Sequence, residues 1–181
     1  VDIIRWAKKR GVNVTAEVTP HHLLLSEELV RGYDARFKVN PPLRRDEDVQ
    51  AVREGLADGT IDIVATDHAP HPDESKSCEW QAAANGMVGL ESALRVVQQA
   101  VVDTGLLDWN DVARVMSRNP ARIGGLDEHG GQLAPGEVGP VAVGALGDDG
   151  DEMPPPVDEI GERLGDLLGV GEDVGPVQLV Q

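Results

Sequence analysis

Three titratable side chains follow an apolar run in the stretch ATDHAPH. Asp67, His68 and His71 come directly after the apolar segment 61–65. A carboxylate can bind a cation and move protons, and an imidazole can bind a metal or hydrogen-bond a substrate. This combination suits a metal-activated hydrolysis. The alternative is that Asp67 caps the next turn and that both histidines are surface residues.

Other polar residues stand at similar places in the chain. In TPHH, His21 and His22 follow a predicted strand, where neighbouring side chains point in opposite directions, so at most one of them would face a site. Asn40 stands before two prolines, and its amide can both donate and accept hydrogen bonds. A turn asparagine is the alternative there. The glycines of NGMVGLE, residues 85–91, could leave backbone N–H groups free to bind an anion.

The composition limits the partners that these residues could serve. The chain has 181 residues, with 16 Lys and Arg against 32 Asp and Glu, for a formal charge of −16. This balance argues against nucleic acid and against an anionic membrane surface as partners. No apolar run approaches the roughly 18 residues of a spanning helix. The single Cys78 rules out an internal disulfide and fits a cytoplasmic location.

The elements that would position these residues alternate between helix and strand. Period and capping signals predict helices over 1–10, 46–57, 89–102 and 109–119, and strands over 12–19 and 61–66. Asp108 is predicted to cap the last helix, which should stop at Asn119–Pro120. The second strand has few polar interruptions, as strands covered on both faces do. The order predicts a parallel α/β fold.

Taken in order, several motifs resemble one family. EVTPHHLLLSEE, KVNPPLR, DGTIDIVATDHAPH, GMVGLE, SRNPARIGGL and GGQLAPGE together resemble the dihydroorotases of the amidohydrolase superfamily. The resemblance covers residues 1–137, about three quarters of the chain. It implies a zinc-dependent, reversible hydrolysis of L-dihydroorotate to N-carbamoyl-L-aspartate, a step of de novo pyrimidine synthesis. It also implies a (β/α)8 barrel and a small β domain.

The resemblance also implies roles for individual residues. Asp67 would bind zinc, accept a proton from the attacking water and return it to the leaving nitrogen. The substrate-binding residues that it implies are Asn40, His71, Asn85 and Gly86. Many relatives have an aromatic residue in place of Asn85, so its side chain has no assigned role. The histidines of TPHH are not zinc ligands in this comparison.

Other family features are absent from the sequence. No histidine precedes His21, so the His-x-His metal motif is missing, as are the bridging carboxylate and two further metal histidines. We therefore expect 1–126 to be the carboxyl-terminal part of a barrel, with its last two strands and helices. Residues 127–137 would begin the small β domain. A single ligand cannot hold a catalytic zinc, which needs about three, so this segment is expected to be inactive alone.

The last quarter of the chain has a different composition. Residues 138–181 carry one basic and ten acidic side chains, with three consecutive prolines and many glycines. This composition predicts a mobile acidic tail, and the loss of the family pattern there suggests that it is read out of frame or is unrelated.

Two alternative functions stay open. The chain could belong to another cyclic-amide hydrolase of the dihydropyrimidinase or allantoinase type. It could also be a non-catalytic partner of aspartate carbamoyltransferase, since some dihydroorotase-like chains lack metal ligands. The intact Asp67, His71 and Asn40 favour an enzyme with a small-molecule substrate. A homo-oligomer is a further expectation for the assembly.

Overall fold

The computed structural model describes residues 1–126. The small β domain and the acidic tail that the sequence predicts, at 127–137 and 138–181, lie outside the described residues. In chain order the elements are α1 (Asp2–Lys9), β1 (Glu17–Val18), α2 (Pro20–Leu24), the 3-10 turns η1 (Glu27–Val30) and η2 (Ala35–Phe37), α3 (Asp46–Ala57), β2 (Ile63–Val64), α4 (Asp73–Lys76), α5 (Ala93–Val97), the π-helical turn η3 (Gln98–Val102), α6 (Trp109–Ala113), the π-helical turn η4 (Arg114–Arg118) and α7 (Asn119–Ile123).

The two strands pair in parallel, as the alternation of elements predicts. Glu17 lies opposite Ile63, and Val18 lies opposite Val64. The Ala65 N–H donates to the Val18 carbonyl at 3.0 Å, which continues the pairing beyond β2. Both strands are shorter than the predicted stretches 12–19 and 61–66, because within the described residues the two segments are joined over residues 16–18 and 62–65 only.

The helices before β2 form where the sequence predicts them. α3 has the predicted bounds, with three acidic residues in its first turn, where the helix dipole favours negative charge. α1 ends in two lysines and is followed by Gly11, whose φ of 75° is a conformation that glycine adopts easily. Lys8 of α1 pairs with Asp62 at 2.6 Å, so the helix is tied to the residue before β2.

The helices after β2 differ from the prediction at their ends. The helix expected from Gly89 begins only at Ala93, because the backbone N–H groups of Gly89 and Leu90 donate to the His68 side chain. The last helix does not stop at Pro120 but continues through α7. The proline follows a wide π-helical turn and stands in the first turn of α7, where a missing N–H costs little.

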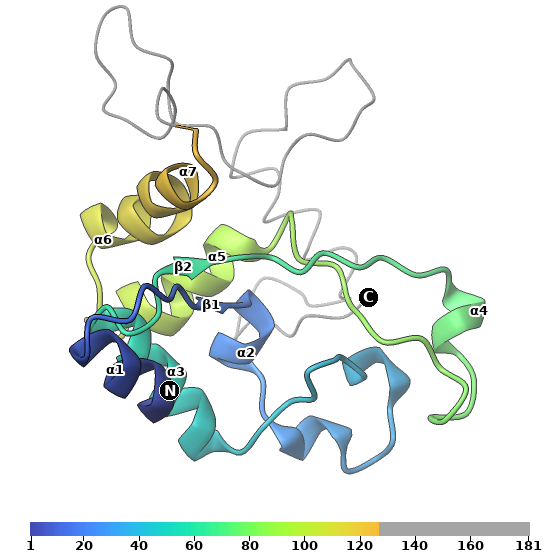
Figure 1. Ribbon diagram of the computed structural model, residues 1–181. Coiled ribbons are helices and arrows are strands. Elements are labelled where there is room, and N and C mark those ends of the chain that lie inside the picture. Colours follow the sequence, from blue (N-terminus) through green and yellow to red (C-terminus); the bar gives the residue numbers. More distant parts are fainter. Residues whose placement is uncertain (127–181) are drawn as a thin grey trace, which may run out of the picture. The chain divides into compact units, whose positions relative to one another are not determined.

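The core of the described residues lies around β1 and β2 (Figure 1). It combines apolar side chains of the strands with those of α2, α3, α5, η3, α6 and η4. The buried cluster consists of Val18, Leu23, Leu56, Ile61, Val64, Val97, Ala100, Val101, Leu107, Val112 and Val115. Asn119 adds a polar link, since its side-chain amide donates to the Asp62 carbonyl at 2.8 Å. In contrast, α4 lies in the long loop region that follows β2.

None of the helices between residues 1 and 126 has the length and apolar character to cross a bilayer.

Candidate functional site

Asp67 lies three residues beyond the end of β2, where the sequence predicts it. It is exposed, and its φ of 48° places its backbone in the left-handed region, which aspartate adopts more readily than most residues. Within residues 1–126 its carboxylate accepts no hydrogen bond, so it does not cap the following turn. The carboxylate is therefore available to a ligand, and the interpretation of Asp67 as a turn cap is not supported.

His68 joins two loops. Its backbone forms a parallel bridge with Met87, and the Ala69 N–H donates to the Met87 carbonyl at 3.0 Å. The His68 Nδ1 atom accepts hydrogen bonds from the backbone N–H groups of Gly89 and Leu90, at 3.0 and 3.2 Å. Because both donors are N–H groups, the Nδ1 atom acts as the acceptor in this arrangement.

These bonds correct the interpretation of the glycine-rich stretch at 85–91. Its backbone N–H groups were expected to be available for an anion, and two of them instead bind His68. Gly89 also lies so close to Thr66 that an added Cβ would stand 3.0 Å from the Thr66 carbonyl oxygen. The stretch therefore packs along the segment that carries Asp67.

His71 lies beside the two residues that the resemblance places at the substrate ring. Its Nε2 atom is 2.9 Å from the Asn85 carbonyl oxygen, which requires a proton on Nε2. Gly86 follows with a φ of 131°, and a Cβ there would stand 2.5 Å from the Ala69 Cβ and 3.1 Å from the His71 Nε2. Only glycine fits this position, because both the backbone conformation and the space exclude a side chain.

Asn40 is exposed and precedes a cis peptide bond to Pro41. Two contacts fix its segment. The Gly86 N–H donates to the Lys38 carbonyl at 2.9 Å, and the His22 Nε2 atom is 3.0 Å from the Pro41 carbonyl oxygen. The segments 38–41, 67–71 and 85–90 thus lie side by side, and they carry all five predicted site residues.

The histidines of TPHH lie in the short helix α2 rather than on an extended chain. His21 is buried, with 2% of its surface exposed, and within the described residues its Nε2 atom has no hydrogen-bond partner. Burial, and secondarily the neighbouring His22 ring, lowers the pKa of His21 to about 4. His22 links the Thr19 hydroxyl, at 2.7 Å from Nδ1, to the Pro41 carbonyl. This link could not be predicted from residue types, because its acceptor is a backbone atom.

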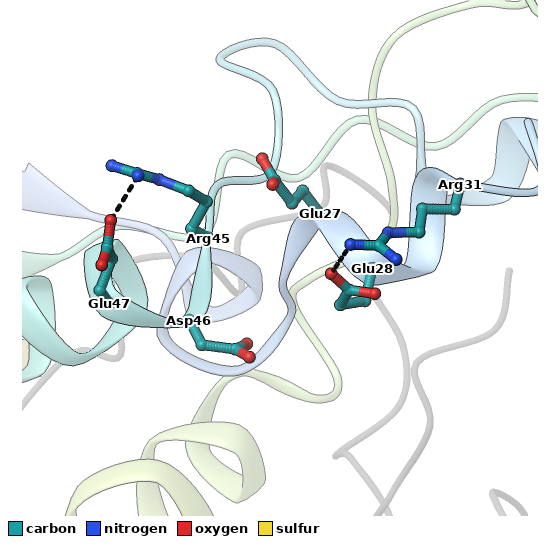
Figure 2. Close-up of a pocket in the computed structure, with 6 residues that line it drawn as sticks. All are labelled: Glu27, Glu28, Arg31, Arg45, Asp46 and Glu47. Carbon is teal, nitrogen blue, oxygen red and sulfur yellow. Dashed lines mark ion pairs between the residues drawn. The ribbon is translucent and has the colours of Figure 1, made fainter.

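A surface hollow of about 360 Å³ lies elsewhere, between η1 and the start of α3 (Figure 2). It is lined by Glu27, Glu28, Arg31, Arg45, Asp46 and Glu47. Both guanidinium groups are already paired, Arg31 with Glu28 and Arg45 with Glu47, each at 2.5 Å. The hollow contains none of the predicted site residues, and its unpaired carboxylates do not suit an anionic substrate.

The described residues do not by themselves form a zinc site. Between residues 1 and 126 no three His, Cys, Asp or Glu side chains are grouped so that they could hold a metal ion. A catalytic zinc takes about three protein ligands, and the sequence predicts only Asp67 as one among these residues.

Residues 1–143 match the family model described as "Amidohydrolase family". The chain belongs to the amidohydrolase family. It is 78% identical over 130 residues to a dihydroorotase of Leifsonia xyli, and 68% identical over 137 residues to that of Streptomyces coelicolor. These matches cover 72% and 76% of this chain but only 30% and 32% of the relatives. The resemblance to dihydroorotases is thus confirmed, and the chain spans about a third of the length of these relatives.

Solved structures agree with the family. The L-hydantoinase (dihydropyrimidinase) from Arthrobacter aurescens matches with a TM-score of 0.69 and 31% identity, over 75% of this chain and 31% of that one. A D-hydantoinase (dihydropyrimidinase) from Thermus sp. matches with a TM-score of 0.62 and 27% identity, over 67% of this chain and 28% of that one. Amidohydrolase membership and these neighbours imply a TIM-barrel-like α/β fold, and the pairing of β1 and β2 is parallel, as the strands of such a fold are.

Proposed function

We propose that this chain contributes part of the active site of a dihydroorotase, an enzyme that reversibly hydrolyses L-dihydroorotate to N-carbamoyl-L-aspartate. The observation that carries the proposal is the convergence of three segments. Asp67, whose carboxylate accepts no hydrogen bond from the part of the chain that the structure describes, lies beyond β2 in a segment that packs along the loop of Asn85 and Gly86. Asn40 lies in the segment bonded to Gly86. The 78% identity to a dihydroorotase supports the same assignment.

The proposed reaction uses Asp67 to move one proton. In hydrolysis the oxygen of a water molecule attacks the amide carbonyl carbon of the ring, and the carbon–nitrogen bond breaks. Asp67 accepts the proton that the water loses and returns it to the leaving nitrogen. Ring closure runs the same steps in reverse, so a single carboxylate serves both directions.

The substrate contacts are assigned to exposed or half-buried polar groups near Asp67. The Asn40 amide can bind both the carboxylate and the amide groups of the substrate, and the His71 ring lies beside the Asn85 carbonyl. We assign the expected backbone contact with the substrate ring to Asn85 and Gly86, whose loop is bonded to both His71 and the Lys38 segment.

The remaining assignments come from the resemblance and the composition. Zinc is the metal that the resemblance implies. Asp67 would supply one ligand, and the others would come from outside residues 1–126. The single Cys78, which is free and exposed, supports a cytoplasmic location.

The test is turnover by the complete gene product that carries these residues. We expect it to hydrolyse dihydroorotate and to leave dihydrouracil and allantoin nearly untouched. Preference for dihydrouracil would replace the proposal with a dihydropyrimidinase, the activity named for the two structural neighbours. Stable co-purification with aspartate carbamoyltransferase, without bound metal or turnover, would instead identify a non-catalytic partner.

A further inference from the structure

Lys76, the last residue of α4, is a buried lysine whose hydrogen bonds go to backbone carbonyl groups. Only 6% of its surface is exposed. Its Nζ atom lies 2.7 Å from the Gly86 carbonyl oxygen, 3.1 Å from that of Ala84 and 3.3 Å from that of Lys38. An ammonium group has three N–H donors, and each has one acceptor here.

Lys38 binds the same loop from the other side. Its Nζ atom lies 2.6 Å from the Ala83 carbonyl oxygen, 2.7 Å from that of Trp80 and 3.4 Å from that of Gln81. Its own backbone carbonyl accepts from both the Gly86 N–H and the Lys76 ammonium. The two lysines therefore hold the loop 80–86 against the segment of Asn40 through one connected set of bonds.

The location of these charges is unusual on energetic grounds. Within residues 1–126 neither ammonium group forms an ion pair with a carboxylate. Burial, and secondarily the neighbouring Lys38 ammonium, lowers the pKa of Lys76, while the Asp34 carboxylate, which is not in contact with it, offsets part of this effect. Removing an ammonium group from water is costly, and neutral carbonyl groups offset less of that cost than a carboxylate would. A methionine or leucine could fill the same space without this cost, but could not bind three carbonyl groups at once.

We propose that Lys76 and Lys38 are positioning residues, which hold the loop of Asn85 and Gly86 against the Asn40 segment and so set the spacing of the substrate contacts. This inference rests on the proposed function for the identity of the substrate. The lysines act through the backbone, and neither is hydrogen-bonded to Asp67. Their loss should therefore affect substrate binding more than the proton transfer.

The experiment compares Lys76→Met and Lys38→Met with Lys9→Met in the complete gene product. Lys9 is an exposed lysine of α1 and gives a matched control for the loss of one charge. Hydrogen exchange of the amides in residues 80–87 is measured first, by mass spectrometry. We expect exchange to rise about 10- to 100-fold in Lys76→Met, the range for losing hydrogen bonds to a charged group, and to stay unchanged in Lys9→Met.

Steady-state kinetics with dihydroorotate give the second measurement. We expect KM to rise about tenfold or more in Lys76→Met while kcat stays within about threefold, and Lys76→Arg to recover part of the loss because it keeps donors and charge. A fall in kcat at unchanged KM would overturn the positioning role, as would unchanged exchange in a folded Lys76→Met protein. If Lys76→Met does not fold, the less buried Lys38→Met decides by the same criteria.

The two proposals fail in different ways. A parent enzyme that does not turn over dihydroorotate refutes the proposed function, while the exchange measurement still tests whether the lysines hold the loop. The positioning role alone is refuted if the parent enzyme is active and Lys76→Met has the same amide exchange in residues 80–87 and the same KM as the parent.

Discussion

Two regions of the described chain are held together by different kinds of contact. Around β1 and β2, apolar side chains of the strands and helices pack on one another and are almost fully buried. In the site loops, which we define as residues 33–44 and 66–92, side chains instead bind backbone groups. Examples there, together with one from α2, are His22, Lys38, His68, His71 and Lys76.

The difference determines what a sequence can reveal. An apolar residue that recurs every three or four positions indicates both the helix and its buried face. A backbone carbonyl group belongs to every residue, so a lysine gives no indication of which carbonyl it binds. We therefore expect changes in the core to alter the stability of the whole, and changes in the site loops to alter function with small effects on stability.

The largest functional effect is expected at Asp67. In the complete gene product, Asp67→Asn should lower kcat for dihydroorotate by about 10²- to 10⁴-fold, the usual contribution of a general acid–base. Stability should change little, because the carboxylate is exposed and accepts no hydrogen bond within residues 1–126. Asp73→Asn, at an exposed carboxylate of α4, is the control and should keep its activity. Near-normal turnover in Asp67→Asn would refute its role.

The largest effect on stability is expected at Leu56 in α3. Its side chain is completely buried in the core cluster. Leu56→Ala should lower the free energy of unfolding by about 2–5 kcal/mol, because the removed methyl groups leave a cavity. Chemical denaturation measures this loss, with Ile3→Ala at an exposed position of α1 as the control. A loss below about 0.5 kcal/mol, as at typical surface sites, would show that α3 is not part of the cooperative core.

The next largest effect is the dependence of the unfolding free energy on pH that His21 causes. Its pKa is about 4 in the folded chain against 6.5 for an ordinary histidine. As the pH falls from 6.5 to 4, the unfolded chain binds a proton that the folded chain does not, so stability is lost over this range. The loss should approach about 3 kcal/mol at pH 4. Denaturation at pH 7.5 and pH 4.5 should show this dependence, and His21→Leu should remove most of it.

Carboxyl groups act over a different pH range. Hydrogen bonds, first of all from Arg36 to Asp34 and from Arg114 to Asp111, lower the pKa of these carboxyl groups below 3.8. The stability that they contribute is present at higher pH and is lost only as the pH falls below that value. An unchanged loss between pH 6.5 and 4 in His21→Leu would therefore mean that His21 is not its source.

The sequence predicted the core better than the site loops. α3 has the predicted bounds, and the pairing of β1 with β2 is parallel as predicted. The error at Pro120 arose because a π-helical turn cannot be recognised from residue types. The five predicted site residues lie on neighbouring segments, since polar residues after a buried strand mark a common edge. Lys76 was not singled out, because a lysine in a stretch of polar and charged residues gives no sign in the sequence that it is buried.

A moderate effect is expected at His71, which joins the site loops through the Asn85 carbonyl. His71→Ala should raise KM for dihydroorotate about tenfold and leave kcat nearly unchanged, because it removes one or two hydrogen bonds from substrate binding rather than from proton transfer. Initial rates over a range of substrate concentrations measure both constants. Glu74→Ala at an exposed position of α4 is the control. If neither constant changes, His71 does not belong to the site.

The smallest effect sharpens the comparison, because it concerns a side chain-to-backbone bond that the sequence did predict. Asp108 caps α6, its carboxylate accepting from the Asp111 N–H at 2.9 Å, and the Asp111 side chain accepts from the Asp108 N–H in return. Asp108→Ala should cost about 1 kcal/mol of unfolding free energy, and Asn110→Ala in the same helix should cost less than about 0.5 kcal/mol.

This cap was predictable because its partner lies three residues away, at a distance fixed by helix geometry. The bonds of Lys76 reach 8, 10 and 38 residues along the chain, and those of Lys38 reach 42 to 45. Local bonds to the backbone are therefore open to prediction from sequence, whereas distant ones are not. If Asp108→Ala and Asn110→Ala lower the free energy of unfolding equally, the cap does not stabilise α6, although the sequence predicts it correctly.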